Sequence, residues 1–576
     1  MTLNFKNVFV NADEQTKKWW LVFFLILLVF LAYFNSLTNN FVSDDITAIL
    51  QNKDITKGSY IFSSPQVFLR TFFLAIIAKI FGLNPIFYRL LNLIFHLGTV
   101  LIAYFLISRL INYKTAFFAA AILAIHPLQI EAVTWISGGP YSQYSFFFLL
   151  SLFFYILSSA NKKFYFASLG SFVLCLLSNE KAMTFPLVLF LFILCFEGIN
   201  PVRNSRFLNG VKKNWKKIIP FLIIILIWGS VFLLTTGGVE KRVIDLESAQ
   251  YQEIKFYNPL IQVPIAITSY LELIFWPKDL TLYHSEMSFK KIEYLVRLII
   301  FILFLGLIIY SFKKNRQVFF WLSFFIITLL PTLTPFAISW VVAERYVYLG
   351  AIGIYVAIAI FLEKISKPPH QSFLKKLWCG GKLKNLNLAV NVVFCLIIAL
   401  LLTRTFFRNI DWKNEDNLWI ATAKTSPSSP NTHNNMGDVY VRHNEYEKAV
   451  LEFKKAIKIN PRYAEAYHNL ANVYLKMNKN EEAIKNYEKA LSFNPHLWQS
   501  YQNLGSIYFK LEKYDLSLES FQKSIKINDK VPELHVNLGI VYLKINNKEK
   551  AKEEFKKALE LDPNNEKIKQ ILSTLK

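Results

Sequence analysis

The stretch NLANVYLKMNKNEEAIKNYEKALSFNP, residues 469–495, decides the fold of the carboxy-terminal part of the chain. Small side chains are interleaved with aromatic rings at helical spacings and a proline closes the stretch, at Ala471, Tyr474, Ala483, Tyr487, Ala490 and Pro495. Small side chains let two helices approach closely, and rings fill the space between them. Because proline cannot continue a helix, Pro495 ends the second one. The stretch therefore predicts a pair of packed helices.

The same pattern returns with a period of 34 residues, which is the tetratricopeptide period. The positions in register are Gly437, Ala471, Gly505 and Gly539; Tyr440, Tyr474, Tyr508 and Tyr542; Phe453, Tyr487, Phe521 and Phe555; and Pro461, Pro495, Asp529 and Pro563. We predict an α-solenoid of four tetratricopeptide repeats over 430–565 and a capping helix over 566–576. Trp419 and Pro427 fit the same register and predict a half-repeat linker helix over 411–429.

One amide side chain recurs on the first helix of each repeat, at Asn435, Asn469, Asn503 and Asn537. An amide both donates and accepts hydrogen bonds, so such a row can bind the backbone of an extended acceptor peptide. The alternative is that these side chains serve helix packing or capping. Both interpretations stay open at this stage.

The first 410 residues have a different character, since apolar runs of roughly 20 residues recur there. Mean hydropathy is +0.32 and 54% of the chain is hydrophobic, which is high for a water-soluble protein. We predict an all-α, polytopic membrane domain over 1–410 with about eleven spans, at 19–38, 86–108, 115–134, 141–159, 164–181, 183–198, 217–236, 294–312, 317–334, 345–362 and 388–405. Two further apolar runs, 66–83 and 259–276, are expected to be interfacial or re-entrant helices.

The formal net charge of +24 lies mainly in the membrane part, because the chain from Pro430 onward has 24 Lys and Arg against 19 Asp and Glu. The excess basic residues lie in short loops between apolar runs, which predicts that these loops are cytoplasmic. The amino terminus is then cytoplasmic and the repeats are extracytoplasmic. No basic helix stands apart from those loops, so nucleic acid is not an expected partner.

The segment FVSDDI, residues 41–46, places Asp44 and Asp45 just after the first apolar run. Two adjacent carboxylates repel, and in a partly dry site one of them has a raised pKa. Such a carboxylate is suited to general-base catalysis. Alternatively, the segment caps a helix that begins near Ile46, where acidic residues favour the helix dipole.

Three more polar clusters fall at the predicted outer ends of spans, in HPLQIEAVTW, SNEKA and AERYVYLG. They contain His126 and Glu131, Glu180 and Lys181, and Glu344 and Arg345. Charged side chains at span ends tend to pair or to face a cavity, so we expect a shared outward-facing cavity with Arg70, Lys241, Arg242 and His284 at its mouth. The alternative for each is a snorkelling or capping role. The sequence has no HExxH, CxxC or GxGxxG signature of a metalloprotease, zinc or dinucleotide site.

The acidic pair, the three clusters in this order and the repeats opening with HNNMGDVY together resemble the transmembrane and tetratricopeptide-repeat O-mannosyltransferases of the GT-C superfamily. The resemblance implies that an acid of the first outer loop, Asp44 or Asp45, is the catalytic base. It also implies a sugar donor, mannose in this family, on polyprenyl or dolichyl phosphate, and Ser or Thr hydroxyls of exported proteins as acceptors. The chain departs from the expected pattern at Gly138-Gly139-Pro140-Tyr141, where an Arg and an acid are expected, so the sugar and the acceptor stay open.

We therefore expect an inverting glycosyltransferase in which positive side chains stabilise the leaving lipid phosphate. The expected donor-binding residues are Arg345, Lys181, Arg242 and Glu344, and the expected partners are the lipid carrier and an acceptor protein held by the repeats. No cofactor is expected apart from the lipid-linked donor, and the need for a divalent metal stays open. Lys, Asn and Ile usage favours a prokaryotic plasma membrane, with the endoplasmic reticulum as the eukaryotic equivalent. Two alternatives stay open: a non-catalytic membrane-anchored repeat scaffold, and a lipid-linked polysaccharide ligase or polymerase.

Overall fold

The computed structural model describes residues 12–197, 214–236, 258–285, 289–333, 341–366 and 384–575. Within these ranges the chain is helical and contains no strand, which confirms the predicted all-α fold class. Backbone contacts divide the chain into two compact units. Thr425 is the last residue of the first, called here the membrane unit, and Ser426 begins the second, called the repeat unit.

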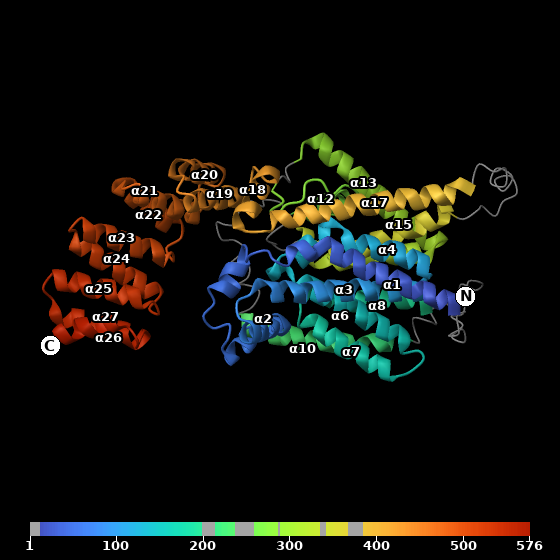
Figure 1. Ribbon diagram of the computed structural model, residues 1–576, viewed down its shortest axis with the longest axis horizontal. Helices are drawn as coiled ribbons and strands as arrows, with labels where there is room; N and C mark the ends of the chain where they lie inside the picture. Colours follow the sequence, from blue (N-terminus) through green and yellow to red (C-terminus); the bar gives the residue numbers. More distant parts are fainter. Residues whose placement is uncertain are drawn as a thin grey trace. The chain divides into compact units, whose positions relative to one another are not determined.

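The membrane unit is a helical bundle in which α1, α3, α4 and α17 lie side by side (Figure 1). Its longer elements are α1 (Ala12–Tyr33), α2 (Phe68–Phe81), α3 (Pro85–Leu110), α4 (Tyr113–Ile125), α6 (Pro140–Leu157), α7 (Lys163–Leu176), α8 (Phe185–Phe192), α10 (Ile219–Thr236), α12 (Pro259–Phe275), α13 (Lys291–Lys314), α14 (Arg316–Leu329), α15 (Ala351–Ser366), α17 (Lys384–Asp411) and α18 (Glu415–Thr425). Short helical turns connect several of these helices.

Six of the described helices are long and apolar enough to cross a bilayer, and a seventh span results if one bent helix pair is counted. Three further apolar helices are shorter, at Lys163–Leu176, Pro259–Phe275 and Arg316–Thr332. The long helix Lys291–Lys314 leaves most of its apolar side chains exposed, as a helix facing lipid does. These helices indicate a multi-pass membrane protein. The count of eleven spans stays a prediction.

The bent pair interrupts the predicted span 115–134. Helix α4 ends at Ile125, a short turn begins at Pro127, and the chain then bends by 57° into α5 (Ile130–Val133). Proline removes a backbone donor and clashes with the preceding turn, which explains the break. The bend places residues 126–140 inside the bundle, where nearly all of them are buried.

The repeat unit consists of paired helices that recur at the predicted spacing of 34 residues. The first helices are α19 (Pro430–Arg442), α21 (Ala464–Lys476), α23 (Trp498–Lys510) and α25 (Pro532–Lys544); the second are α20 (Tyr446–Ile459), α22 (Asn480–Phe493), α24 (Tyr514–Ile527) and α26 (Lys548–Leu561). Helix α27 (Glu566–Thr574) follows the last pair. This confirms the predicted helical repeat, whereas the predicted half repeat stays a prediction because α18 groups with the membrane unit.

The two helices of a repeat approach each other closely at their small residues. A Cβ atom added to Gly505 would lie 2.9 Å from the ring of Phe521, and one added to Gly539 would lie 2.9 Å from Phe555. The turn between the paired helices has a residue with positive φ in every repeat, at Asn444, Asn478, Glu512 and Asn546. Asparagine tolerates this conformation better than most residues, which explains why asparagine recurs at this turn position.

Candidate functional site

The two aspartates of the first outer loop have opposite environments. Asp45 is fully buried, and its Oδ1 atom accepts hydrogen bonds from the backbone N of Ser137 at 2.8 Å and from its Oγ at 2.7 Å. Asp44 is exposed, and its carboxylate makes no hydrogen bond or ion pair with any residue that the structure describes. Asp45 precedes the single turn Ile46–Leu50, but its side chain makes no capping hydrogen bond to that turn. A side-chain cap by Asp45 is therefore absent, whereas the helix-dipole part of the alternative stays open, because both aspartates lie in the first residues of this helical segment.

Burial raises the pKa of Asp45 to about 6, against the lowering effects of the Ser137 hydrogen bonds, the Arg89 guanidinium and the Val42 backbone. Arg89 lies on α3 and is itself buried. It donates to the carbonyl of Thr134 at 3.0 Å and to the carbonyls of Asn39 and Asn40. Arg89 and Ser137 thus fix both sides of this loop.

Asp44 lies between two anchored neighbours. Ser43 donates its backbone N to Oε1 of Glu415 at 2.6 Å and has a φ of 54°, an uncommon conformation for serine. Asp45 is held by Ser137 on the other side. Strained backbone positions of this kind are found where a structure fixes a functional group. Here the result is a solvent-facing carboxylate on a restrained loop.

A second cluster of charges is buried in the same unit. Arg345 donates its backbone N to Oε2 of Glu131 at 2.9 Å, and its Nη1 atom lies 3.2 Å from the same oxygen. Both Glu131 and Glu344 are fully buried. Glu344 accepts a hydrogen bond from the backbone N of Thr281 at 2.5 Å and lies 3.7 Å from both His284 and Arg408. The charges of Glu131, Glu344 and Arg345 are therefore largely compensated inside the protein.

Lys181 is buried against aromatic rings. Its Nζ atom lies 3.5 Å from the ring centroid of Tyr346 and 4.8 Å from that of Tyr141. The guanidinium of Arg345 lies 5.2 Å from the Tyr346 ring and 5.4 Å from that of Trp135. Rings attract cations through their negative faces. Lys181 and Arg345 thus share one aromatic partner.

The segment 126–140 connects the buried charges to the aspartate loop, because Glu131 contacts Arg345 and Ser137 contacts Asp45. It also explains the unexpected Gly138-Gly139 pair. A Cβ atom on Gly138 would lie 1.8 Å from the carbonyl oxygen of Glu131, and one on Gly139 would lie 1.9 Å from Oδ1 of Asn92. Neither position has space for a side chain, so the two glycines permit the tight path of this segment.

The remaining predicted site residues have structural contacts or lie elsewhere. Both ring nitrogens of His126 are engaged, one by the carbonyl of Ile274 at 3.0 Å and one by the backbone N of Leu128 at 3.2 Å. Glu180 begins a short turn before α8 and is half-buried. Arg242 and Lys241 lie outside the described residues. Among the residues that the structure describes, no three His, Cys, Asp or Glu side chains are grouped as metal ligands.

The asparagine row of the repeat unit is partly used within the protein. Asn469 donates to Oδ1 of Asn434 at 3.1 Å, and Asn503 donates to Oδ1 of Asn472 at 2.9 Å. These bonds join neighbouring repeats and support the packing interpretation at those two positions. Asn435 and Asn537 are half-buried, and peptide binding by the row stays a prediction.

Sequence reasoning missed three residues that organise the aspartate loop, namely Ser137, Arg89 and Glu415. Arg89 carries a signal that could have found it, because an arginine in an apolar span usually pairs with a functional group or with backbone carbonyls. Ser137 and Glu415 carry no such signal. Their roles depend on contacts with residues 92 and 372 positions away.

Models of the tetratricopeptide repeat match residues 437–478, 464–497, 505–546 and 532–565. The human protein O-mannosyl-transferase TMTC3 is 25% identical over 492 residues, which are 76% of this chain and 51% of that protein. The Caenorhabditis elegans protein O-mannosyl-transferase F38B6.6 is 24% identical over 471 residues, and the match covers 76% of this chain and 62% of that protein. The crystal structure of MamA is 22% identical, with a TM-score of 0.25, and covers 29% of this chain and 95% of its own.

These findings confirm the predicted resemblance to the transmembrane and tetratricopeptide-repeat O-mannosyltransferases. The chain spans about half the length of the human relative that it matches.

Proposed function

We propose that this protein is an integral membrane glycosyltransferase that moves a sugar, mannose in the first instance, from a polyprenyl or dolichyl phosphate to Ser or Thr hydroxyls of exported proteins. The proposal is supported by the relatives named O-mannosyl-transferases and by the restrained loop around Asp44. The exposed Asp44 carboxylate between two anchored neighbours is the observation that carries it.

In the proposed reaction, the acceptor hydroxyl oxygen attacks the anomeric carbon of the sugar while Asp44 takes the hydroxyl proton. The bond between that carbon and the phosphate oxygen breaks, and the lipid phosphate leaves with the electron pair. A single displacement of this kind inverts the anomeric configuration. General-base assistance contributes about 10²- to 10⁴-fold to such a step.

Asp45 has a positioning role in this proposal. Its carboxylate is enclosed by Ser137 and by the backbone of its own loop, so it is not accessible to an acceptor hydroxyl. Lys181, whose amine lies over the Tyr346 ring, contributes positive potential to the site, whereas the charge of Arg345 is largely compensated by Glu131.

The repeats are proposed to hold the acceptor protein. Tetratricopeptide solenoids present extended concave surfaces, and a tethered binding module raises the local concentration of its ligand near the membrane unit. This role is compatible with the packing contacts of the asparagine row. Asn469 and Asn503 use their Nδ2 atoms to join neighbouring repeats, and their Oδ1 atoms take no part in those hydrogen bonds.

The test compares Asp44→Asn, Asp45→Asn and Asp54→Asn in the purified full-length chain in detergent. Sugar transfer is measured from radiolabelled polyprenyl-phosphate mannose to a Ser/Thr-rich peptide. We expect Asp44→Asn to lower the turnover rate about 10²- to 10⁴-fold. Asp54 is the matched control, since it is an exposed aspartate of the same outer loop, paired only with Lys57 at 2.6 Å among the described residues.

Asp54→Asn should keep the wild-type rate. Transfer by Asp44→Asn within threefold of wild type would remove Asp44 from the chemistry. Absence of any transfer in the wild-type chain, with normal membrane insertion, would favour the scaffold alternative.

A further inference from the structure

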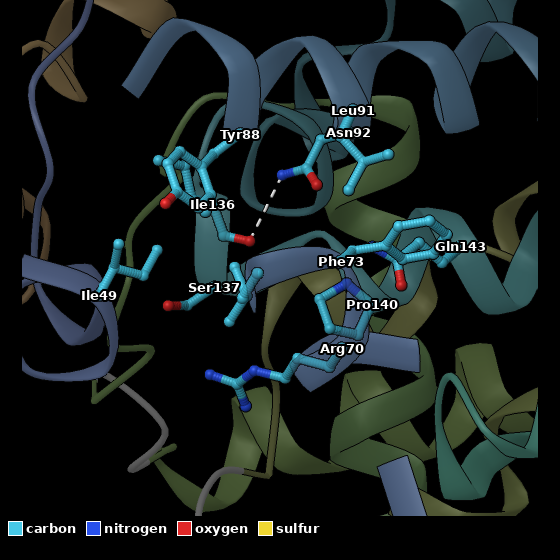
Figure 2. Close-up of a pocket in the computed structure, with 11 residues that line it drawn as sticks. Ile49, Arg70, Phe73, Tyr88, Leu91, Asn92, Ile136, Ser137, Pro140 and Gln143 are labelled. Atoms are coloured by element: carbon cyan, nitrogen blue, oxygen red, sulfur yellow. Dashed lines mark hydrogen bonds between the residues drawn. The ribbon is translucent and has the colours of Figure 1, made fainter. Parts of the chain in front are cut away.

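A pocket in the membrane unit lies directly beside the aspartate loop. It is lined by side chains from α2, α3 and α6 and by Ile49, Ile136 and Ser137. Figure 2 shows the guanidinium of Arg70 and the side chain of Ser137 on the same side of this pocket, with Gln143 across from them. Ser137 is the residue that holds Asp45 at 2.7 Å, so a group bound in this pocket lies next to the loop that carries Asp44.

Two polar groups of this pocket have no hydrogen-bond or ion-pair partner among the described residues. Arg70 makes no hydrogen bond or ion pair with the described residues. Gln143 is 3% exposed, and its Oε1 atom has no hydrogen-bond partner in the part of the chain that the structure describes. Burying a polar atom without a hydrogen bond costs free energy, which a bound ligand recovers. The pocket therefore offers a free guanidinium donor and a free amide acceptor within apolar walls such as Phe73 and Leu91.

Three other cations of the membrane unit, Arg345, Lys181 and Arg297, are already engaged. Arg345 is paired with Glu131, and Lys181 is covered by the rings of Tyr346 and Tyr141. Arg297 lines a different pocket, where it is paired with Glu272 at 2.7 Å. That second pocket also contains Asp279, so its charged side chains disfavour an anion. Among the described residues that line the pocket beside Ser137, Arg70 is the one with a charged side chain.

We propose that the Arg70 pocket binds the phosphate of the lipid-linked donor, with Arg70 as the direct phosphate ligand. This inference rests on the proposed function and deepens it, because it replaces Arg345 and Lys181 as the direct contacts. A guanidinium can form two parallel hydrogen bonds to phosphate oxygens. Gln143 accepts a hydrogen bond from a hydroxyl of the attached sugar. The anomeric carbon is thereby held next to the Asp44 loop.

The test measures binding rather than transfer. A short-chain polyprenyl monophosphate and the polyprenyl alcohol of the same length are titrated in detergent against the full-length chain and its Arg70→Gln, Arg70→Lys and Lys79→Gln variants. We expect Arg70→Gln to raise the Kd for the phosphate about tenfold or more, while the weak binding of the alcohol is unchanged. Arg70→Lys keeps a positive charge but cannot form two parallel hydrogen bonds to the phosphate, and it should raise the Kd less.

Lys79→Gln is the matched control, because Lys79 is an exposed cation in the last turn of the same helix and does not line the pocket. It should keep wild-type binding. An equal loss in Lys79→Gln, an equal loss for the alcohol, or an Arg70→Gln chain that binds the phosphate as wild type does would each overturn the inference.

The two proposals fail separately. An Asp44→Asn chain should bind the polyprenyl phosphate normally even though it transfers sugar much more slowly. If binding depends on Arg70 but the wild-type chain transfers no sugar, the pocket stands and the enzymatic proposal falls. If transfer proceeds in Arg70→Gln with an unchanged KM for the donor, the enzymatic proposal stands and the pocket assignment falls.

Discussion

The repeat unit and the membrane unit are stabilised by different kinds of contact. In the repeat unit, a buried ring packs on a small residue of the paired helix, as Phe521 does on Gly505, and the arrangement recurs every 34 residues. In the membrane unit, buried polar groups join distant segments, as Asn39 does with the carbonyl of Asn409, 370 positions away. Apolar packing tolerates exchange of similar side chains, whereas a buried polar contact requires both partners. We therefore expect single substitutions to have larger effects in the membrane unit.

The largest effect is expected at the buried ion pair. Arg345→Met leaves the Glu131 carboxyl group fully buried and without the guanidinium that pairs with it. Breaking a buried pair in this way costs about 3–5 kcal/mol. The measurement is thermal unfolding in detergent together with hydrogen exchange of peptides from each unit, so that the change is assigned to the membrane unit.

The matched substitution in the repeat unit is Lys523→Met. Lys523 pairs with Glu519 at 2.7 Å on the helix surface, and about half of each side chain is exposed. Such a pair contributes about 0.3–0.5 kcal/mol or less. Equal losses for the two variants would contradict the proposed difference between the units. The double variant Glu131→Met with Arg345→Met should recover part of the loss, since no buried charge remains.

The next largest effect is expected from replacing a glycine with alanine, and its size depends on which atoms the added Cβ atom would contact. A Cβ atom on Gly138 collides with a backbone carbonyl oxygen, whereas one on Gly505 meets only the ring of Phe521 at 2.9 Å. A ring can turn slightly, but a backbone oxygen can move only with its segment. We expect Gly138→Ala to cost about 3 kcal/mol, the upper end of the usual range for overpacking, and to disturb the Ser137 contact with Asp45.

For Gly505→Ala, the higher helix propensity of alanine offsets the closer contact, and we expect a change within about 1 kcal/mol. The chain supplies its own control, because Ala471 occupies the same register position in the neighbouring repeat and is buried there. Thermal unfolding of both variants checks the comparison. A Gly138→Ala chain with wild-type stability and transfer would contradict it.

The same contrast decides how much of the structure the sequence predicts. The repeats were predictable because the relevant contacts are local and periodic. Residues such as Gly437, Tyr474 and Phe555 recur in register, so the sequence itself predicts which residues they contact. In the membrane unit, hydropathy predicts helices such as α3 and α17, but α4 is cut short at Ile125 by a proline whose effect the hydropathy of the segment conceals.

The candidate site was only partly predictable for a related reason. The acidic pair in the sequence identifies the loop, but the assignment of one aspartate as buried and the other as exposed depends on Ser137 and Arg89. Likewise, Gly138-Gly139 is a departure from the expected pattern in the sequence, and only the positions of Glu131 and Asn92 show why glycine is needed. Long-range polar contacts leave no periodic trace in a sequence.

A smaller effect is expected from the ionisation of Asp45. Its pKa is about 6 in the folded protein against 3.8 for the free side chain, because burial disfavours the charged form. Between these values the folded protein keeps a proton that the unfolded chain has released. Stability therefore falls as the pH rises from about 4 to about 6, by about 2–3 kcal/mol.

Asp45→Asn should remove this slope, because the amide does not titrate. Arg89 faces Asp45 and stays charged throughout this range, so it does not contribute a slope of its own. The measurement is the unfolding midpoint between pH 4 and pH 7 with hydrogen exchange of peptides around residues 40–50. A slope that persists in Asp45→Asn would assign the titration to another group.

The smallest effect is expected in the repeat unit, at a position where one repeat departs from the others. The turn residue with positive φ is asparagine at 444, 478 and 546 but glutamate at 512, where φ is 60°. A non-glycine residue other than Asn or Asp is uncommon in this conformation. We expect Glu512→Asn to stabilise the repeat unit by about 0.5–1 kcal/mol without changing the membrane unit.

Glu533→Asn, an exposed substitution in the first turn of the next helix, is the control and should give no gain. Since the gain depends on local backbone strain alone, it should appear as slower hydrogen exchange confined to the α23–α24 repeat, and a stabilisation spread over the membrane unit would show that the two units are coupled rather than independently stabilised.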